Sequence, residues 1–295
     1  MVESIAGPPH SESICNRMDI QRCSLNAITL RSLNLNELIT GATTRRIQHV
    51  APWIETIDPI GAREAKKFLD DHGITVSSLC RSGFFPASTH TERIKALDQV
   101  KRDIESAAVL EAGCLAIVAG GIPAKPKNPK ELAGSGIQGA RDMVRTGLES
   151  VVDYAGECGV ALGLEPLHPM MAADRCVICS LTEANDLIET IDHPSLGLLV
   201  DAYHVWHDAQ LEQQVQRASG RILGLHLSDW VLPITDHLGS RGMIGDGIID
   251  LRGLIATVDK AGYHGPIEVE ILSNYWWSQP PDLVLDTIVN RWVLL

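Results

Sequence analysis

The chain has 295 residues, of which 45% are hydrophobic and 21% are charged, a balance typical of a folded globular protein rather than a disordered one. Its formal net charge of −12 argues against a broad surface for nucleic acid or for anionic membranes. No apolar run approaches the ~20 residues of a membrane span and the N-terminus has no secretory apolar core, so we expect a cytoplasmic protein that contacts neither nucleic acid nor a membrane.

Short apolar segments alternate with longer helical patterns from residue 23 onward. The first residues are polar and contain a Pro-Pro step, so we expect an N-terminal arm, disordered or loosely held, over residues 1–22. The strands predicted after it are, in chain order, 23–30, 47–54, 75–80, 114–120, 160–167, 196–203, 222–229 and 266–272. The helical patterns lie near 34–45, 59–72, 91–112, 137–158, 180–191, 209–219, 250–261 and 281–293.

The order of these segments predicts the fold class. Several strands are nearly continuous apolar runs, which is typical of parallel strands covered by helices on both faces. Glycines follow several of the helices, as expected for C-caps, at Gly73, Gly113, Gly159 and Gly262. Eight strand–helix units predict an α/β protein with a single (β/α)8 TIM barrel, the catalytic domain, over residues 23–295.

Four of the late strands each carry one ionisable residue near the carboxyl end, namely Glu165, Asp201, His226 and Glu270. A TIM barrel places its chemistry at the carboxyl ends of its strands, and an unpaired buried charge is costly. Three carboxylates and one imidazole in one barrel mouth therefore predict a site for one divalent metal ion. Three oxygens and one nitrogen favour Mn²⁺, with Mg²⁺, Co²⁺, Fe²⁺ or Zn²⁺ as alternatives, over a structural zinc site.

The last strand offers two glutamates for this site. Glu268 and Glu270 are two residues apart, so alternation places both on the same face of the strand. Glu270 lies nearer the carboxyl end and is the predicted ligand. We expect Glu268 to belong to a buried network or to a lower layer of the barrel.

Five sequence blocks resemble the xylose-isomerase-like barrels, a family that includes sugar epimerases, inosose isomerases and inosose dehydratases. The resemblance is strongest from about residue 160 to residue 290. It rests on LEPLHP (164–169), VDAYHVWHD (200–208), LHLSD (225–229), RGMIGDGIIDL (241–251) and AGYHGPIEVE (261–270). Resemblance to this family implies that the metal ligands are Glu165, Asp201, His226 and Glu270.

The same resemblance implies further roles in substrate binding. His204 matches a histidine that contacts substrate oxygens, and Arg241 matches an arginine that holds a substrate hydroxyl or carbonyl group. His168, three residues after Glu165, is expected to be another substrate contact. Asp250 is interpreted as the N-cap of the helix that follows the Gly245–Gly247 turn.

These residues favour a metal-dependent isomerase or epimerase of a keto-sugar or a cyclic polyol ketone. Glu165 and Glu270 would be the catalytic groups, since a carboxylate can remove the proton next to a carbonyl that a metal ion polarises. The alternative is a lyase on the same type of substrate, either an inosose-type dehydratase or an eliminase that cleaves a 3-keto-glycoside. The net charge and the ligand count disfavour an endonuclease-type zinc barrel, and the complete ligand set disfavours a non-catalytic barrel. Whether the chain forms a homo-oligomer is left open.

Overall fold

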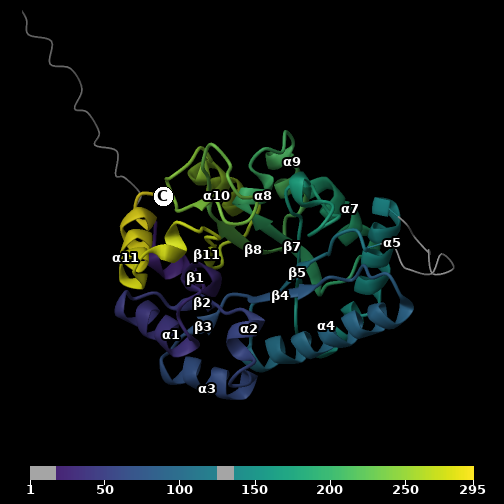
Figure 1. The fold of residues 1–295 in the computed structure, drawn as a ribbon, viewed down its shortest axis with the longest axis horizontal. Coiled ribbons are helices and arrows are strands. Elements are labelled where there is room, and N and C mark those ends of the chain that lie inside the picture. The colour runs from purple at the N-terminus through teal and green to yellow at the C-terminus, as the bar shows by residue number, and fades with distance from the viewer. Residues whose placement is uncertain (1–17, 125–135) are drawn as a thin grey trace, which may run out of the picture.

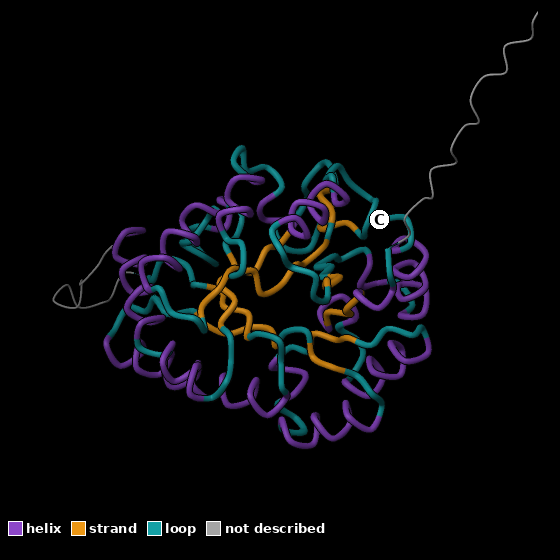
Figure 2. Tube along the Cα trace, turned by 180° about the vertical axis from the view of Figure 1, so that it is seen from behind, coloured by secondary structure: helices purple, strands orange, loops and turns teal. Residues whose placement is uncertain are grey.

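Parallel strands form the centre of the molecule, and helices lie around them (Figure 1; Figure 2). The computed structural model describes residues 18–124 and 136–295, so most of the predicted arm over residues 1–22 lies outside the described residues. The parallel strands are β1 Cys23–Asn26, β2 His49–Ala51, β3 Thr75–Val76, β4 Leu79–Gly83, β5 Leu115–Val118, β6 Leu162–Glu165, β7 Leu196–Asp201, β8 Ile222–Leu227 and β11 Ile267–Val269.

The strands run in the order β3-β2-β1-β11-β8-β7-β6-β5-β4, and every neighbouring pair is parallel. The predicted third strand is split, because β3 pairs with β2 whereas β4 pairs with β5. A bridge between Trp53 and Cys80, with the Cys80 N–H donating to the Pro52 carbonyl at 3.0 Å, joins the two ends of the sheet. The ring is therefore closed, and the predicted TIM barrel is confirmed.

The helices cover the outside of this ring (Figure 1). They are α1 Leu35–Thr44, α2 Ile54–Ile57, α3 Ala62–Asp71, α4 His90–Leu110, α5 Gly136–Glu149, α6 Val152–Glu157, α7 Leu181–Ile191, α8 Ala202–Val205, α9 Leu211–Arg217, α10 Leu251–Lys260 and α11 Pro281–Trp292. Capping boxes begin α1, at Asn34 and Glu37, and α4, at Thr89 and Glu92. Asp250 accepts a hydrogen bond from the Gly253 N–H, so the predicted N-cap of α10 is confirmed.

Two predicted helix features differ from the structure. The single helix predicted over 137–158 is divided into α5 and α6. Gly113 is not the C-cap residue predicted after α4, because Glu111 takes the left-handed conformation there with φ 52°. Position 113 favours glycine for a steric reason, since a Cβ atom there would lie only 2.5 Å from the Ser77 carbonyl oxygen.

A short antiparallel pair that the sequence analysis did not predict follows β8. Strands β9, Asp229–Trp230, and β10, Arg241–Gly242, pair with each other beside the carboxyl ends of the barrel strands. The buried Asp229 carboxylate accepts hydrogen bonds from the backbone N–H groups of Gly245, Gly247 and Ile249. These bonds fold the turn after β10 back onto β9 and so fix where Arg241 enters the barrel mouth.

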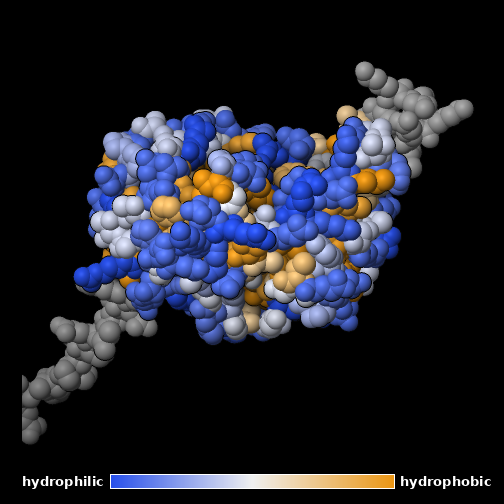
Figure 3. All heavy atoms as spheres, turned by 90° about the horizontal axis from the view of Figure 1, so that it is seen from below, coloured by the Kyte–Doolittle hydropathy of each residue, from blue (hydrophilic) through white to orange (hydrophobic). Residues whose placement is uncertain are grey.

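One side of the molecule, seen from below relative to Figure 1, carries mainly hydrophilic residues with hydrophobic ones among them (Figure 3). Singly exposed apolar side chains are normal on a folded protein. Within residues 18–124 and 136–295, none of the helices is sufficiently long and apolar to span a bilayer.

Replacing Thr29 by valine should destabilise the contact between the 3-10 helix Ala27–Leu30, which follows β1, and the last barrel strand. The buried Thr29 hydroxyl donates to the Val269 carbonyl and accepts from the Ile271 N–H, both at 2.8 Å. Valine has the same shape but leaves both backbone groups unpaired, which costs about 1–3 kcal/mol. Urea unfolding measures this loss. The control Thr40→Val, at an exposed position on α1, should change stability far less, and equal losses in the two variants would contradict the assignment.

Candidate metal and substrate site

The structure brings the four predicted ligand residues together at the carboxyl ends of neighbouring strands. Glu165 ends β6, Asp201 ends β7, His226 lies one residue before the end of β8, and Glu270 directly follows β11. All four side chains are buried. One oxygen or nitrogen atom from each residue lies within 4.8 Å of those of the other three, so a single ion could touch all four.

The His226 ring lies between two sets of carboxylates. Its Nδ1 is 3.4 Å from Glu165 Oε1 and 3.7 Å from Glu270 Oε2. Its Nε2, on the far side of the ring, is 3.1 Å from Glu268 Oε2. Nδ1 therefore faces the proposed ion position, whereas Nε2 faces a carboxylate behind the ring, the usual arrangement of a metal-binding histidine.

Glu268 belongs to a buried network that reaches the first and third barrel strands, as the sequence analysis expected. Asn26 Nδ2 donates to Glu268 Oε2 at 3.0 Å, and Ser77 Oγ donates to Oε1 at 2.8 Å. Asn26 in turn accepts a hydrogen bond from the indole N–H of Trp53 at 2.7 Å. These bonds fix the carboxylate that contacts His226, so Glu268 is placed to orient the imidazole.

Arg241 reaches the cluster from β10. Its Nη1 donates to Asp201 Oδ2 at 2.9 Å and to Glu270 Oε2 at 3.0 Å, so one guanidinium holds two of the buried carboxylates. Its Nη2 lies 2.9 Å from Nε2 of His204, which follows Asp201 on α8. Arg241 and His204, two of the three predicted substrate contacts, therefore lie beside each other in the site.

The third predicted substrate contact, His168, is placed differently. Its backbone N–H donates to His204 Nδ1 at 3.1 Å, and its own ring packs against Trp230 with 5.0 Å between ring centroids. Its Nδ1 accepts a hydrogen bond from the Met170 N–H. His168 thus orients His204 through the backbone, while its side chain caps the short helix Pro169–Met171.

Burial and nearby positive charges shift the pKa values of the carboxylates in opposite directions. Burial raises the pKa of Glu165 to about 7, although the nearby His226 opposes the shift. Burial would also raise the pKa of Asp201, but the charges of Arg241 and of the two nearby histidines, together with the hydrogen bond from the Tyr203 N–H, outweigh burial and lower this pKa to about 2. In the absence of a metal ion, Glu165 therefore binds a proton near neutral pH whereas Asp201 stays ionised.

The pKa values of His204 and His226 are shifted in opposite directions. Burial lowers the pKa of His204 to about 3, with Arg241 contributing in the same direction, so this ring is neutral at physiological pH. Burial alone would lower the pKa of His226 as well, but the charges of Glu268 and Glu270 raise it well above the ordinary value.

The donor set fits a divalent ion. Three carboxylates and one imidazole nitrogen suit Mn²⁺, Mg²⁺, Co²⁺, Fe²⁺ or Zn²⁺. Both ring nitrogens of His226 are buried without a hydrogen-bond partner, and Nδ1 is the one that faces the carboxylates of Glu165 and Glu270. A second group, Cys80 with His226 and Glu268, is also close enough to hold an ion. It is the poorer candidate, because burial raises the pKa of the Cys80 thiol well above its ordinary value and a thiolate is needed for metal binding.

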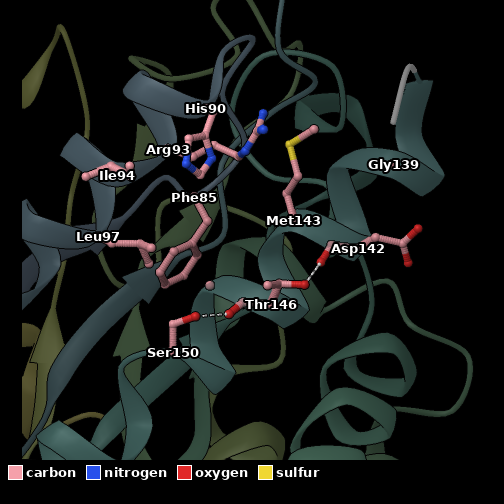
Figure 4. A pocket seen from close by; sticks show the side chains of 11 residues that line it. Phe85, His90, Arg93, Ile94, Leu97, Gly139, Asp142, Met143, Thr146 and Ser150 are labelled. Atoms are coloured by element: carbon pink, nitrogen blue, oxygen red, sulfur yellow. Dashed lines mark hydrogen bonds between the residues drawn. The ribbon is translucent and has the colours of Figure 1, made fainter. Parts of the chain in front are cut away.

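The cavity above the cluster is lined by both apolar and basic side chains. Glu165, His204, Arg241 and Glu270 contribute to its wall, together with Trp53, Cys80, Arg81, Phe84, Ala116, Val118, Leu167, Met171, Arg175, Leu238 and Leu272. A larger cavity lies on the outside of the barrel between α4 and α5, where Phe85 and Met143 are among the residues that line it (Figure 4). It contains none of the clustered ligand residues, so the smaller cavity is the candidate site.

Several residues of the site were not identified from the sequence. Ser77 precedes the β4 half of the split third strand, Arg81 lies within β4, and Arg175 lies in the loop after β6. None of them interrupts a long apolar run, which was the signal that identified the ligand residues.

Relatives with assigned activities include a dehydratase and an epimerase. A 3-dehydroshikimate dehydratase of Pseudomonas putida is 26% identical over 153 residues, which is 48% of this chain and 22% of the dehydratase. An L-ribulose-5-phosphate 3-epimerase, UlaE, of Salmonella paratyphi C is 23% identical over 208 residues, which is 68% of this chain and 66% of the epimerase. The matched region thus spans about a fifth of the first relative and about two thirds of the second.

Solved structures share the barrel over nearly its whole length. Protein SMc04130 of Sinorhizobium meliloti 1021 is 41% identical, with a TM-score of 0.87 over 93% of this chain and 98% of that one. The IolI protein, solved with a zinc atom, is 18% identical, with a TM-score of 0.77 over 92% of this chain and 96% of that one. A family model described as xylose isomerase-like TIM barrel matches residues 37–288, which confirms the resemblance inferred from the sequence.

Binding of Mn²⁺ to the metal-free protein should release protons at about pH 6–7. Glu165, with its pKa raised to about 7, and His226, with its raised pKa, hold protons that a cation must displace, whereas Asp201 holds none. Affinity should therefore rise with pH across this range. Calorimetry in two buffers of different ionisation enthalpy measures the release, and Glu165→Gln should reduce it. Equal heats in both buffers would contradict the prediction.

Proposed function

We propose that this chain, which belongs to the xylose isomerase-like TIM barrel family, is a divalent-metal-dependent isomerase or epimerase of a keto-sugar or a cyclic polyol ketone. One observation carries the proposal: three carboxylates and one imidazole converge within 4.8 Å at the carboxyl end of the barrel. In this proposal Glu165, Asp201, His226 and Glu270 are the metal ligands. The zinc atom in the structure of the IolI protein and the activity of the epimerase relative add support.

The bound ion would polarise a substrate carbonyl group and stabilise the negative charge that forms when a neighbouring C–H proton is removed. Glu165 and Glu270 are the proposed proton-transfer groups. They come from β6 and from the residue after β11, and β7 and β8 lie between these strands in the sheet. The two carboxylates therefore approach the cavity from different sides. Removal by one and return by the other would invert the carbon, whereas return to the adjacent carbon would give isomerisation.

His204 and Arg241 are the proposed contacts to substrate oxygens. His204 Nδ1 accepts the His168 N–H, so in the neutral ring Nε2 carries the hydrogen. This N–H and the Arg241 guanidinium are both donors, and they meet at 2.9 Å without an acceptor between them. A substrate hydroxyl or carbonyl oxygen placed against both would satisfy them.

A lyase on the same type of substrate is the second candidate, and the dehydratase relative favours it. Loss of a β-substituent after the same proton removal would give a dehydratase or an eliminase. Product mass separates the two candidates, because an isomerase conserves it. An endonuclease-type zinc barrel has less support, since His226 is the one histidine in the ligand group found among the described residues.

Asp201→Asn and His204→Ala should separate metal binding from substrate binding. Asp201→Asn should weaken metal binding by about tenfold or more, because a neutral amide is a poorer ligand for a divalent ion. His204→Ala should keep the ion and instead raise KM or lower kcat. Metal content and competition with a chelating dye measure the first effect. Equal loss of metal in both variants would contradict this division of roles.

Glu165→Gln and Glu270→Gln should each retain part of the metal but lose turnover by ~10²–10⁴-fold, because glutamine cannot accept a proton at neutral pH. The assay incubates metal-loaded protein with ketoses, inososes and 3-keto-glycosides in D₂O and follows exchange, inversion and elimination by NMR. In an epimerase, one variant should still exchange the proton of one epimer without inverting the carbon.

The matched control is Glu64→Gln, at an exposed position on α3. Metal content is measured on every sample, since metal loss alone would imitate loss of a base. Near wild-type turnover in both metal-replete glutamine variants would show that neither glutamate is the base. Absence of metal, with full activity in a chelator, would contradict the proposed function altogether.

A further inference from the structure

Two arginines line the candidate cavity without an acidic partner. Arg81 lies on β4 and Arg175 lies in the loop after β6, and both are half-buried. Across residues 18–124 and 136–295, neither guanidinium forms an ion pair. Arg22, by contrast, donates to both oxygens of Asp259.

Arg81 is held against aromatic rings. Its guanidinium carbon lies 4.4 Å from the centre of the Trp53 ring and 5.5 Å from that of Phe84. Trp53 is itself fixed by its hydrogen bond to Asn26. Contacts of this kind hold the guanidinium beside the rings, and they do not use its N–H groups, which can bind a ligand.

Arg175 is held through its backbone. Its N–H donates to the Met171 carbonyl at 3.0 Å, and the next residue, Cys176, forms a bridge with Gly120 after β5. The chain passes so close to Gly121 that a Cβ atom there would lie 2.8 Å from the Arg175 nitrogen. The loop therefore presents Arg175 on the β5 side of the cavity, and β4, which carries Arg81, is the neighbour of β5 in the sheet.

The charges of the cavity wall separate into two regions. Around the proposed ion position, Arg241 contacts Asp201 and Glu270, and the third carboxylate, Glu165, lies beside them. A divalent ion together with Arg241 balances these three carboxylates in formal charge, while the fourth, Glu268, lies behind His226 and does not line the cavity. Arg81 and Arg175 then leave positive charge on the β4–β5 side, within a chain whose net charge is −12.

We propose that Arg81 and Arg175 bind an anionic group of the substrate, a phosphate monoester or a carboxylate, while the reacting carbons lie over the ligand cluster. The proposal rests on the proposed function and narrows its substrate class to anionic keto-sugars or keto-acids. Guanidinium groups bind both anions through paired N–H donors, so the chemistry is shared and the experiment distinguishes the two. A neutral sugar would leave both cations of the wall without a counter-charge.

Calorimetry with matched ligand pairs tests this proposal. Ribulose 5-phosphate is compared with ribulose for the phosphate, and 5-ketogluconate with fructose for the carboxylate. The wild-type protein should bind one anionic ligand at least about tenfold more tightly than its neutral counterpart, and the preference should weaken as salt is added. The pair that shows the preference identifies the anion.

Arg81→Gln and Arg175→Gln should each reduce the ratio of anionic to neutral affinity by about tenfold. Arg63→Gln, at an exposed position on α3, is the matched control and should keep the ratio. Thermal unfolding confirms that each variant is folded. Equal affinities within both ligand pairs, or a ratio that survives in both variants, would overturn the proposal.

Metal content and deuterium exchange are measured on the same samples. Absence of metal and of exchange with every ketose would contradict the proposed function. The affinity ratios are obtained independently of that result, so loss of anion preference and loss of metal-dependent chemistry are distinguished.

Discussion

The mutual repulsion of buried carboxylates is the constraint on which the centre of this molecule depends. Glu165, Asp201, Glu268 and Glu270 are all at most 6% exposed at one end of the barrel. Carboxylates taken out of water need a counter-charge or a proton. Here Arg241 supplies one counter-charge, His226 supplies another, and Glu165 can bind a proton near neutral pH. A divalent ion would replace the proton on Glu165 and the one on Nδ1 of His226.

Two irregular parts of the fold place polar groups beside these buried carboxylates. The β9–β10 pair delivers Arg241 to the carboxylates, and the Asp229 carboxylate holds the turn behind it. The split of the third strand leaves Ser77 between β3 and β4, where its hydroxyl reaches Glu268. Both departures from a regular barrel thus supply polar partners to buried acids.

The strands of the second half and the ionisable residues that cluster at their ends could be predicted, because each of these residues interrupts or ends a long apolar run. Asp201 at the end of LGLLVD and His226 in ILGLHL have this pattern. The β9–β10 pair could not be predicted, because strands of two residues have no periodicity. Arg81 and Arg175 were missed for another reason: arginine is common on surfaces, and only the closed barrel shows that these two line the same cavity as Glu165.

The network behind His226 ties the first strand of the chain to the last. Asn26 and Glu268, which share a buried hydrogen bond, are separated by 242 residues of sequence. Such a contact forms only when β1 and β11 have paired, which requires the closure of a large loop of chain. The position of the carboxylate beside His226 therefore depends on the pairing of the first strand with the last. A cation would accordingly bind tightly only to chains in which β1 and β11 have paired. By mass action, this binding would stabilise the paired state against unfolding.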